Sequence, residues 1–97
     1  MAVKSRRDPE FRRLFAELPA EVQEAATSNF LLWKANERHP SLHFKEWAPG
    51  RWSVRVSKGW RALGRKRADG SYLWYWIGSH SAYDKLLRET NKRKGKK

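Results

Sequence analysis

Between residues 52 and 77 the chain contains three stretches of strand-like sequence, and the segments between them are only long enough for turns. In residues 52–57, large apolar residues alternate with polar ones, which is typical of a half-buried strand. Residues 58–59 and 68–71 each contain a glycine and supply the two turns. Because turns this short join antiparallel neighbours, this region is expected to form an antiparallel sheet.

Two helices are expected before the sheet. Asp8, Pro9 and Glu10 form a typical helix start, with a capping side chain, a proline in the first turn and an early acid. Apolar residues then recur with helical spacing, at Phe11, Leu14, Phe15 and Leu18. Pro19 interrupts this pattern, and a second amphipathic segment occupies residues 20–36. The two helices would form a hairpin whose apolar side covers the sheet.

Further signals complete the expected order of elements. A short strand near residues 43–47 would be the fourth, and residues 72–77, apolar on both faces, would lie inside the sheet. Ser79 or Ser81 can then cap a last helix. These elements predict one α+β domain over residues 1–97. In it, an N-terminal helical hairpin packs on a twisted antiparallel sheet of three to four strands, followed by a short C-terminal helix.

The positive charge is concentrated in the second half of the chain. The net charge is +12, and residues 37–97 carry 16 Lys or Arg against 5 Asp or Glu, whereas residues 1–36 carry 6 against 5. Such a surface favours polyanions as partners. Residues 91–97 form a basic tail with no apolar side chain to bury, and we expect this tail to be mobile.

Several classes of protein are disfavoured by the composition. The chain has no cysteine, which excludes disulfides and zinc sites with thiolate ligands. No apolar run approaches the roughly 20 residues of a membrane span, and residues 1–11 lack an apolar signal core. We therefore expect a cytoplasmic protein without a membrane partner.

The segment WSVRVSKGWRALG, residues 52–64, places Arg55 and Arg61 on consecutive strands joined by a very short turn. If the alternation turns Trp52 towards the helices, Arg55 points to the other face of the sheet. Arg61 on that same face would bring two guanidinium groups together. A phosphate between them would relieve their repulsion through charge-assisted hydrogen bonds. The alternative is two arginines that are simply solvated.

His80 follows the last strand, where functional side chains of a sheet often lie, and an imidazole suits proton transfer near neutral pH. Tyr83 lies one helical turn further on, so both side chains can face the same side. Considered alone, a histidine at this position is more often a capping or surface residue. Pro40 separates His39 from His43 and prevents a helical two-histidine face, so no metal site is expected.

The sequence lacks the motifs of several common kinds of active site. It contains no phosphate-binding loop, dinucleotide fingerprint or nucleophile elbow, and the acidic residues of the second half are scattered. What remains is a cationic site with arginines, a histidine and a tyrosine, without metal or cofactor. This inventory fits RNA cleavage by internal transesterification, in which the 2′-OH attacks the adjacent phosphate.

Four segments in this order resemble the RelE/ParE superfamily of bacterial type II toxins: FRRLFAELPAEVQEAA, HPSLHFKEW, RWSVRVSKGWRALG and YWIGSHSAYDKLL. The last segment resembles a RelE-like branch whose final strand ends in W-I-G-S/T-H-x-x-Y-D. The resemblance runs from about residue 9 to residue 87. It implies a helical hairpin on a twisted antiparallel sheet. It also implies a toxin that enters the ribosome, cuts mRNA and is held inactive by a cognate antitoxin.

The resemblance also implies roles for single residues. Arg55 matches a basic position on the first long strand of RelE-like toxins, and Arg61 matches the arginine that binds the scissile phosphate. His80 falls where the family has a residue for proton transfer or leaving-group stabilisation. Tyr83 matches, at a different spacing, the tyrosine that stacks on or orients the nucleotide. Ser53 departs from the pattern, since some RelE toxins carry a lysine there.

Two further sets of residues are expected at this site. The general base is open, with Glu46, His43 and His39 as candidates. Basic residues of the same strands and turns would bind RNA, namely Lys45, Arg51, Lys58 and Arg65.

Two other functions remain open at this point. A ParE-like inhibitor of DNA gyrase shares the fold and needs no catalytic histidine. A non-catalytic nucleic-acid-binding module of the same fold would need only the positive charge. Because function belongs to a site and not to a fold, the two arginines together with His80 favour the nuclease.

Overall fold

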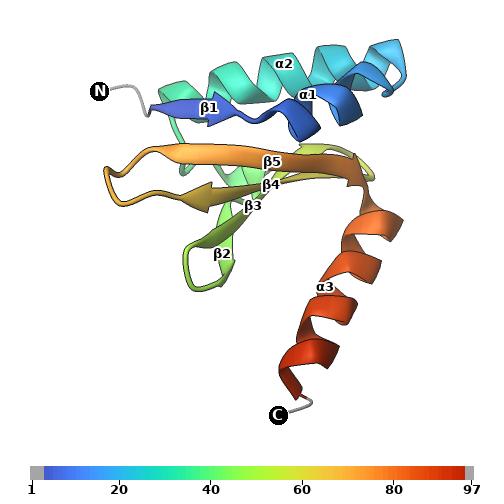
Figure 1. Ribbon diagram of the computed structural model, residues 1–97. Coiled ribbons are helices and arrows are strands. Elements are labelled where there is room, and N and C mark those ends of the chain that lie inside the picture. Colours follow the sequence, from blue (N-terminus) through green and yellow to red (C-terminus); the bar gives the residue numbers. More distant parts are fainter. Residues whose placement is uncertain (1–3, 96–97) are drawn as a thin grey trace.

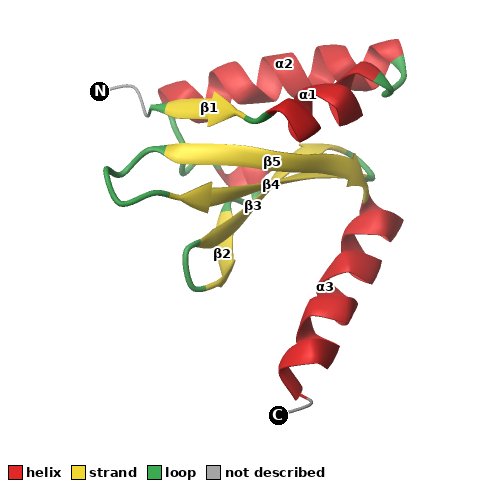
Figure 2. Ribbon diagram, viewed as in Figure 1, coloured by secondary structure: helices red, strands yellow, loops and turns green. Residues whose placement is uncertain are grey.

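The computed structural model describes the backbone of residues 4–95 and the side chains of residues 4–89. Two helices, α1 (Pro9–Ala16) and α2 (Ala20–Ala35), cover one face of a five-stranded sheet, and α3 (His80–Gly95) projects from its other side (Figure 1). Figure 2 shows that short turns and loops connect these elements. The expected α+β class is confirmed.

The helical hairpin forms as the sequence predicts. The Asp8 side chain caps α1 by accepting a hydrogen bond from the Phe11 amide at 3.0 Å. Pro19 ends the first apolar repeat and directly precedes α2, where its missing N–H is not needed. The Gln23 side chain then ties the two helices together by donating to the Phe15 carbonyl at 2.9 Å.

Four strands form the antiparallel part of the sheet, and each pairs with the next in sequence: β2 (Lys45–Ala48), β3 (Arg51–Ser57), β4 (Trp60–Lys66) and β5 (Tyr72–Ser79). A turn of 3-10 helix, Pro40–Leu42, leads into β2. Both predicted turns are present, and Gly59 has a φ of 84°, a conformation that favours glycine.

The sequence does not predict the fifth strand. β1 (Ser5–Arg7) pairs with β5 in parallel, which gives the strand order β1-β5-β4-β3-β2. The sheet therefore has one strand more than the three to four expected, and one of its edges is parallel. Three residues are too few to show an alternating pattern. The strand exists because the distant β5 supplies its hydrogen bonds, as between the Asp8 amide and the Trp74 carbonyl at 3.0 Å.

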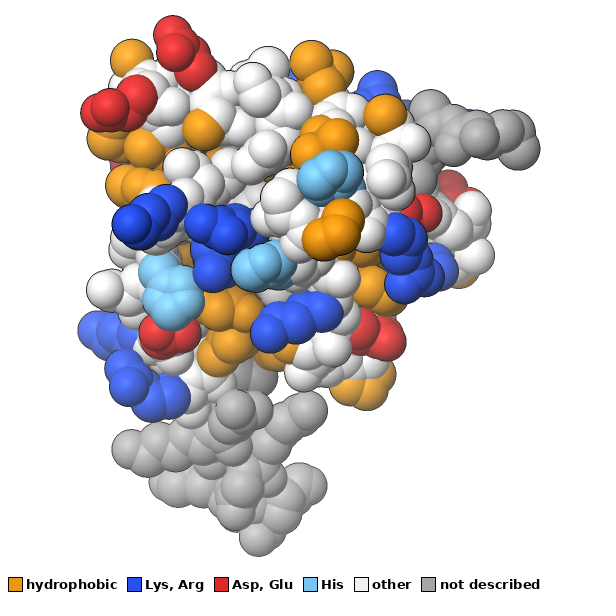
Figure 3. All heavy atoms as spheres, turned by 180° about the vertical axis from the view of Figure 1, so that it is seen from behind, with side chains coloured by type: hydrophobic (Ala, Val, Ile, Leu, Met, Phe, Trp, Pro, Cys, Tyr) orange, Lys and Arg blue, Asp and Glu red, His pale blue; other side chains and the backbone are white. Residues whose placement is uncertain are grey.

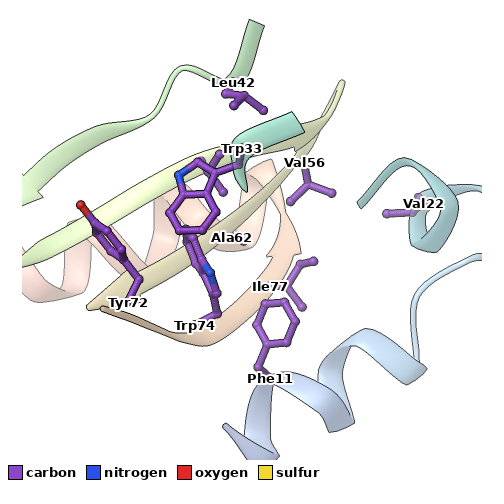
Figure 4. Packing of buried hydrophobic residues seen from close by; sticks show 10 residues of the cluster. Phe11, Val22, Trp33, Leu42, Val56, Ala62, Tyr72, Trp74 and Ile77 are labelled. Atoms are coloured by element: carbon purple, nitrogen blue, oxygen red, sulfur yellow. The ribbon is translucent and has the colours of Figure 1, made fainter. Parts of the chain in front are cut away.

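Trp33 lies at the centre of the core between α2 and the sheet. It is 1% exposed, and its ring meets the rings of Phe44, Tyr72 and Trp74 edge-on, with centroid distances of 5.6, 5.3 and 5.2 Å. Figure 4 shows Trp33 beside Tyr72 and Trp74. Aromatic pairs with this geometry contribute roughly 0.5–1.5 kcal/mol beyond burial, so Trp33 holds α2 firmly on β5.

Helix α3 begins at a cap that the sequence indicates. The Ser79 hydroxyl accepts a hydrogen bond from the Ala82 amide at 3.2 Å. The helix has 16 residues and is longer than the short helix expected, so the backbone of the predicted tail is helical up to Gly95. The rest of that tail, and its side chains, lie outside the described residues, and its mobility stays a prediction. No helix in the described part of the chain is both long and apolar enough to cross a membrane.

Gly64 of β4 lies against the ring of Trp74. A Cβ atom at this position would be 2.7 Å from Trp74 Cε3, and the ring is held in the core at 3% exposure. We expect Gly64→Ala to lower the free energy of unfolding by about 1–3 kcal/mol, measured by urea titration. In a Trp74→Leu background the same substitution should cost less, because the clashing atoms are gone. Equal costs in the two backgrounds would contradict this packing explanation.

Candidate functional site

The two faces of the sheet have different surroundings. Val54 and Val56 of β3 belong to the core beneath α1 and α2, so the residues that alternate with them point to the other face. That other face meets the start of α3, where the Tyr83 hydroxyl donates to Ser53 Oγ at 3.4 Å. We call it the α3 face. The register places six residues of β3 and β4 on it: Arg51, Ser53, Arg55, Arg61, Leu63 and Arg65.

Arg55 and Arg61 lie directly opposite each other on the α3 face, where the alternation in the sequence predicts them. Side chains paired in this way start roughly 5 Å apart at Cβ, and like charges so placed destabilise the sheet. Among the described residues neither guanidinium has an acidic partner, and Arg61 Nη1 donates to the Trp60 carbonyl at 3.0 Å. The pair is therefore two uncompensated positive charges at a defined spacing, which suits an anion.

The first residue of α3 is held beside this pair. The His80 amide donates to the Gly59 carbonyl at 2.7 Å, in the turn that joins the two arginine-bearing strands. His80 Nδ1 lies 3.1 Å from Asp84 Oδ2, one turn further along α3. With Nδ1 donating to the carboxylate, Nε2 is the nitrogen left to exchange a proton with a ligand. Within the described part of the chain, the imidazole forms no hydrogen bond to either arginine.

Tyr83 is placed differently from its expected role. It is 6% exposed, its ring centroid lies 5.8 Å from that of His80, and its hydroxyl reaches Ser53. A ring this buried is not available to stack on a nucleotide. Tyr83 instead anchors the first turn of α3 on the sheet and so orients His80. Ser53 beneath it is 2% exposed, which explains why this position holds a small residue and not a lysine.

The other residues expected to bind RNA surround the pair: Lys45, Arg51, Lys58 and Arg65. Lys45 is the register partner of Ser53, and Arg65 is that of Arg51. The Arg51 guanidinium lies over the Tyr75 ring, 5.7 Å from its centroid. Lys58 is exposed in the β3–β4 turn. Figure 3 shows Lys, Arg and His side chains close together across the middle of one side of the molecule.

The candidate general bases are not all brought to the α3 face. Glu46 is the register partner of Trp52, whose ring packs on the core side, and its Oε2 accepts a hydrogen bond from the Gly50 amide at 2.8 Å. Glu46 therefore belongs to the other face. The His39 ring accepts a hydrogen bond from the backbone of its own 3-10 turn, and His43 is exposed at the end of that turn.

Two residues of the site were not anticipated from the sequence. Asp84 holds the His80 ring, and its i,i+4 spacing on a helix was the available signal. Gly78 is the register partner of Arg61, and a Cβ there would lie 2.7 Å from Trp76 Cζ2, so only glycine leaves room for that ring. An isolated glycine within a strand signals such a close approach. Among the described residues, no three His, Cys, Asp or Glu side chains form a metal-binding group.

The fold is similar to that of several solved toxin structures. A mutant of the E. coli toxin RelE in the free state has a TM-score of 0.68 and 17% identity, covering 96% of this chain and 98% of that chain. A chain of the archaeal RelE–RelB complex from Pyrococcus horikoshii has a TM-score of 0.63 and 8% identity, covering 81% and 96%. The chain has a RelE-like fold.

A further similar structure is the RelBE2 toxin–antitoxin complex from Mycobacterium tuberculosis, with a TM-score of 0.58 and 16% identity over 82% of this chain and 100% of that chain. No protein-family model and no curated protein matches the sequence. The RelE-like character is therefore carried by the arrangement of the elements and not by residue identity. A shared fold does not carry over an activity, so the argument for function rests on the α3 face.

The anchoring role of Tyr83 can be tested by unfolding. Tyr83→Ala should lower the free energy of unfolding by about 3–5 kcal/mol, because a buried aromatic ring is lost. Tyr83→Phe should cost no more than about 1 kcal/mol, because the hydrogen bond to Ser53 is long at 3.4 Å. Urea titrations followed by tryptophan fluorescence measure both variants. Equal costs would show that the hydroxyl, and not the ring, holds α3 in place.

Proposed function

We propose that this chain is the toxin of a bacterial type II toxin–antitoxin system and that it cuts mRNA on the ribosome. The observation that carries the proposal is the pair of Arg55 and Arg61 within a RelE-like fold. The two residues are in register on neighbouring strands, and neither guanidinium has an acidic partner among the described residues. An RNA phosphate would offset their repulsion through charge-assisted, bidentate hydrogen bonds.

In the proposed reaction the ribose 2′-oxygen attacks the adjacent phosphorus, and the bond from phosphorus to the next 5′-oxygen breaks. The products are a 2′,3′-cyclic phosphate and a free 5′-hydroxyl, so no water is consumed. Negative charge develops on the non-bridging oxygens in the transition state. Arg55 and Arg61 would stabilise this charge with N–H donors that the sheet orients before the substrate arrives.

His80 would be the proton carrier for the leaving group. Its Nδ1 lies 3.1 Å from the Asp84 carboxylate, so Nε2 would deliver a proton to the departing 5′-oxygen. The 2′-hydroxyl must also lose its proton. His43, exposed just before β2, is the candidate base for this step, because Glu46 lies towards the other face.

The proposal also includes a protein partner. Two of the similar structures are complexes, one of RelE with RelB and one named as the toxin–antitoxin complex RelBE2. We propose that this chain likewise binds a cognate antitoxin that holds it inactive. Since the chain has a net charge of +12, the antitoxin segment that contacts it is expected to be acidic.

Substitution of the two key residues tests the chemistry. Arg61→Ala should slow single-turnover cleavage of ribosome-bound mRNA by about 10²–10³, because one fixed donor to the transition state is lost. His80→Ala should slow it by about 10²–10⁴, the usual contribution of a positioned proton carrier. The upstream cleavage product should end in a 2′,3′-cyclic phosphate, which its resistance to polynucleotide adenylation and its mass would reveal.

The matched control is Arg13→Ala, which removes an exposed arginine from α1 on the other side of the sheet. This variant should cleave at the wild-type rate when the ribosome is saturated. If expression of wild type and of His80→Ala arrests growth equally and no mRNA is cut, the proposal is wrong. A gyrase-type target, measured by DNA supercoiling, would then be the explanation.

A further inference from the structure

A second group of basic residues lies at the opposite end of the sheet from Arg55 and Arg61. Two adjoining hollows open beside the edge strand β1, near the last turn of α2 and the β4–β5 turn. Figure 1 shows β1 and the β4–β5 turn at one end of the sheet and the start of α3 at the other. Six cationic side chains line the hollows, and we call them the β1 cluster: Lys4, Arg6, Arg7, Arg12, Lys34 and Arg67.

The charges of the β1 cluster are not neutralised within the described part of the chain. Asp69 is the acid in the lining, and its carboxylate accepts hydrogen bonds from the Ser71 hydroxyl and N–H at 2.6 and 2.9 Å. These bonds hold the pKa of Asp69 below its usual value, so it is ionised near neutral pH and offsets one positive charge. None of the salt bridges among the described residues involves a member of the cluster.

Protection of the sheet edge explains only part of this arrangement. Charged side chains on an edge strand discourage pairing with other chains, and this accounts for Arg6 and Arg7. It does not account for Arg12 of α1, Lys34 of α2 and Arg67 of the turn, which converge on the same hollows from outside the strand. A concave surface lined by charges of one sign focuses its field and attracts a polyanion.

We infer that the β1 cluster binds the sugar–phosphate backbone of double-stranded RNA. Four of its six members are arginines, whose planar guanidinium groups match phosphate oxygens. Sites for single-stranded RNA add aromatic rings on which bases stack. Here the aromatic residue in the lining is Phe30, and the Lys34 ammonium lies over its ring, 5.4 Å from the centroid. Without a free ring the cluster contacts phosphates and not bases, so it binds without sequence preference.

The β1 cluster and the arginine pair are separate sites. Arg61 and Lys66 lie at the two ends of β4, roughly 16 Å apart at about 3.3 Å per residue, and Arg67 follows Lys66. Strands β5 and β4 also lie between β1 and the Arg55-bearing β3. The inference therefore stands apart from the proposed ribonuclease activity. The cluster determines how tightly RNA is held, and the pair determines the chemistry at one phosphate.

Binding of a labelled, blunt RNA duplex of about 16 base pairs tests the inference, with fluorescence anisotropy recorded at several salt concentrations. Arg6→Glu/Lys34→Glu should weaken binding by about tenfold or more. It should also reduce the slope of log affinity against log salt by about 2, one for each lost phosphate contact. Arg6→Gln/Lys34→Gln should show the same change in slope with a smaller loss of affinity. Circular dichroism verifies that each variant is folded.

The matched control is Arg38→Glu/Lys85→Glu, which changes the net charge equally at two exposed positions outside the cluster. Its salt slope should stay at the wild-type value. If both charge-reversal variants lose affinity and slope equally, only net charge matters and the inference is overturned. It is also overturned if duplex binding survives Arg6→Glu/Lys34→Glu while binding of poly-glutamate is lost, since the cluster would then dock an acidic protein segment.

Single-turnover cleavage separates this inference from the proposed function. Arg6→Glu/Lys34→Glu should keep the wild-type cleavage rate at saturating ribosome concentration, whereas Arg61→Ala should keep duplex affinity and lose rate. Loss of duplex binding in Arg6→Glu/Lys34→Glu supports RNA binding by the β1 cluster even if the wild-type chain does not cleave mRNA.

Discussion

The pairing of β3 with β4 across residues 58–59 is the constraint on which the rest of the site depends. It sets Arg55 opposite Arg61 on one face, and on the other face it sets Val54 opposite Ala62 in the core beneath the helices. A slip of β3 by one residue against β4 would exchange the two faces of β3 and turn Arg55 into the core. The burial of the valines therefore holds the arginine pair in register. The Gly59 carbonyl, in the same turn, also accepts a hydrogen bond from the amide of His80, the first residue of α3.

The aromatic core allows the protein to hold like charges together. A pair of like charges on opposed strand positions costs up to about 1 kcal/mol. Trp33 alone makes three edge-on ring contacts, each worth roughly 0.5–1.5 kcal/mol beyond its burial. These ring contacts lie in the core and do not depend on salt, whereas the arginine pair is only half-buried, so salt screens part of its repulsion. The uncompensated arginines therefore cost little stability, and both remain available to bind an anion.

Local sequence patterns were sufficient to predict the part of the candidate site that lies on β3 and β4. Alternation along β3 and the short turn were sufficient to place Arg55 and Arg61 on one face, because side chains on a strand alternate strictly. Local patterns do not reach the surroundings of Tyr83 and Glu46. Helical spacing places Tyr83 near His80 but does not say that the sheet buries it, and the position of Glu46 depends on which partner β2 meets.

The sequence by itself determined the helical hairpin, the antiparallel strands β2 to β5 and a serine cap for the last helix. Each of these follows from signals within a few residues, such as a proline, a turn glycine or an apolar repeat. Only the tertiary structure decided the parallel pairing of β1, the anchoring of α3 through Tyr83, and the β1 cluster. These features join residues that lie far apart in the chain. Residues 1–36 carry little net charge, so the sequence does not indicate a basic site in β1, α1 and α2. The fold creates this site because it brings the cations of these elements to one edge of the sheet and places their acids elsewhere.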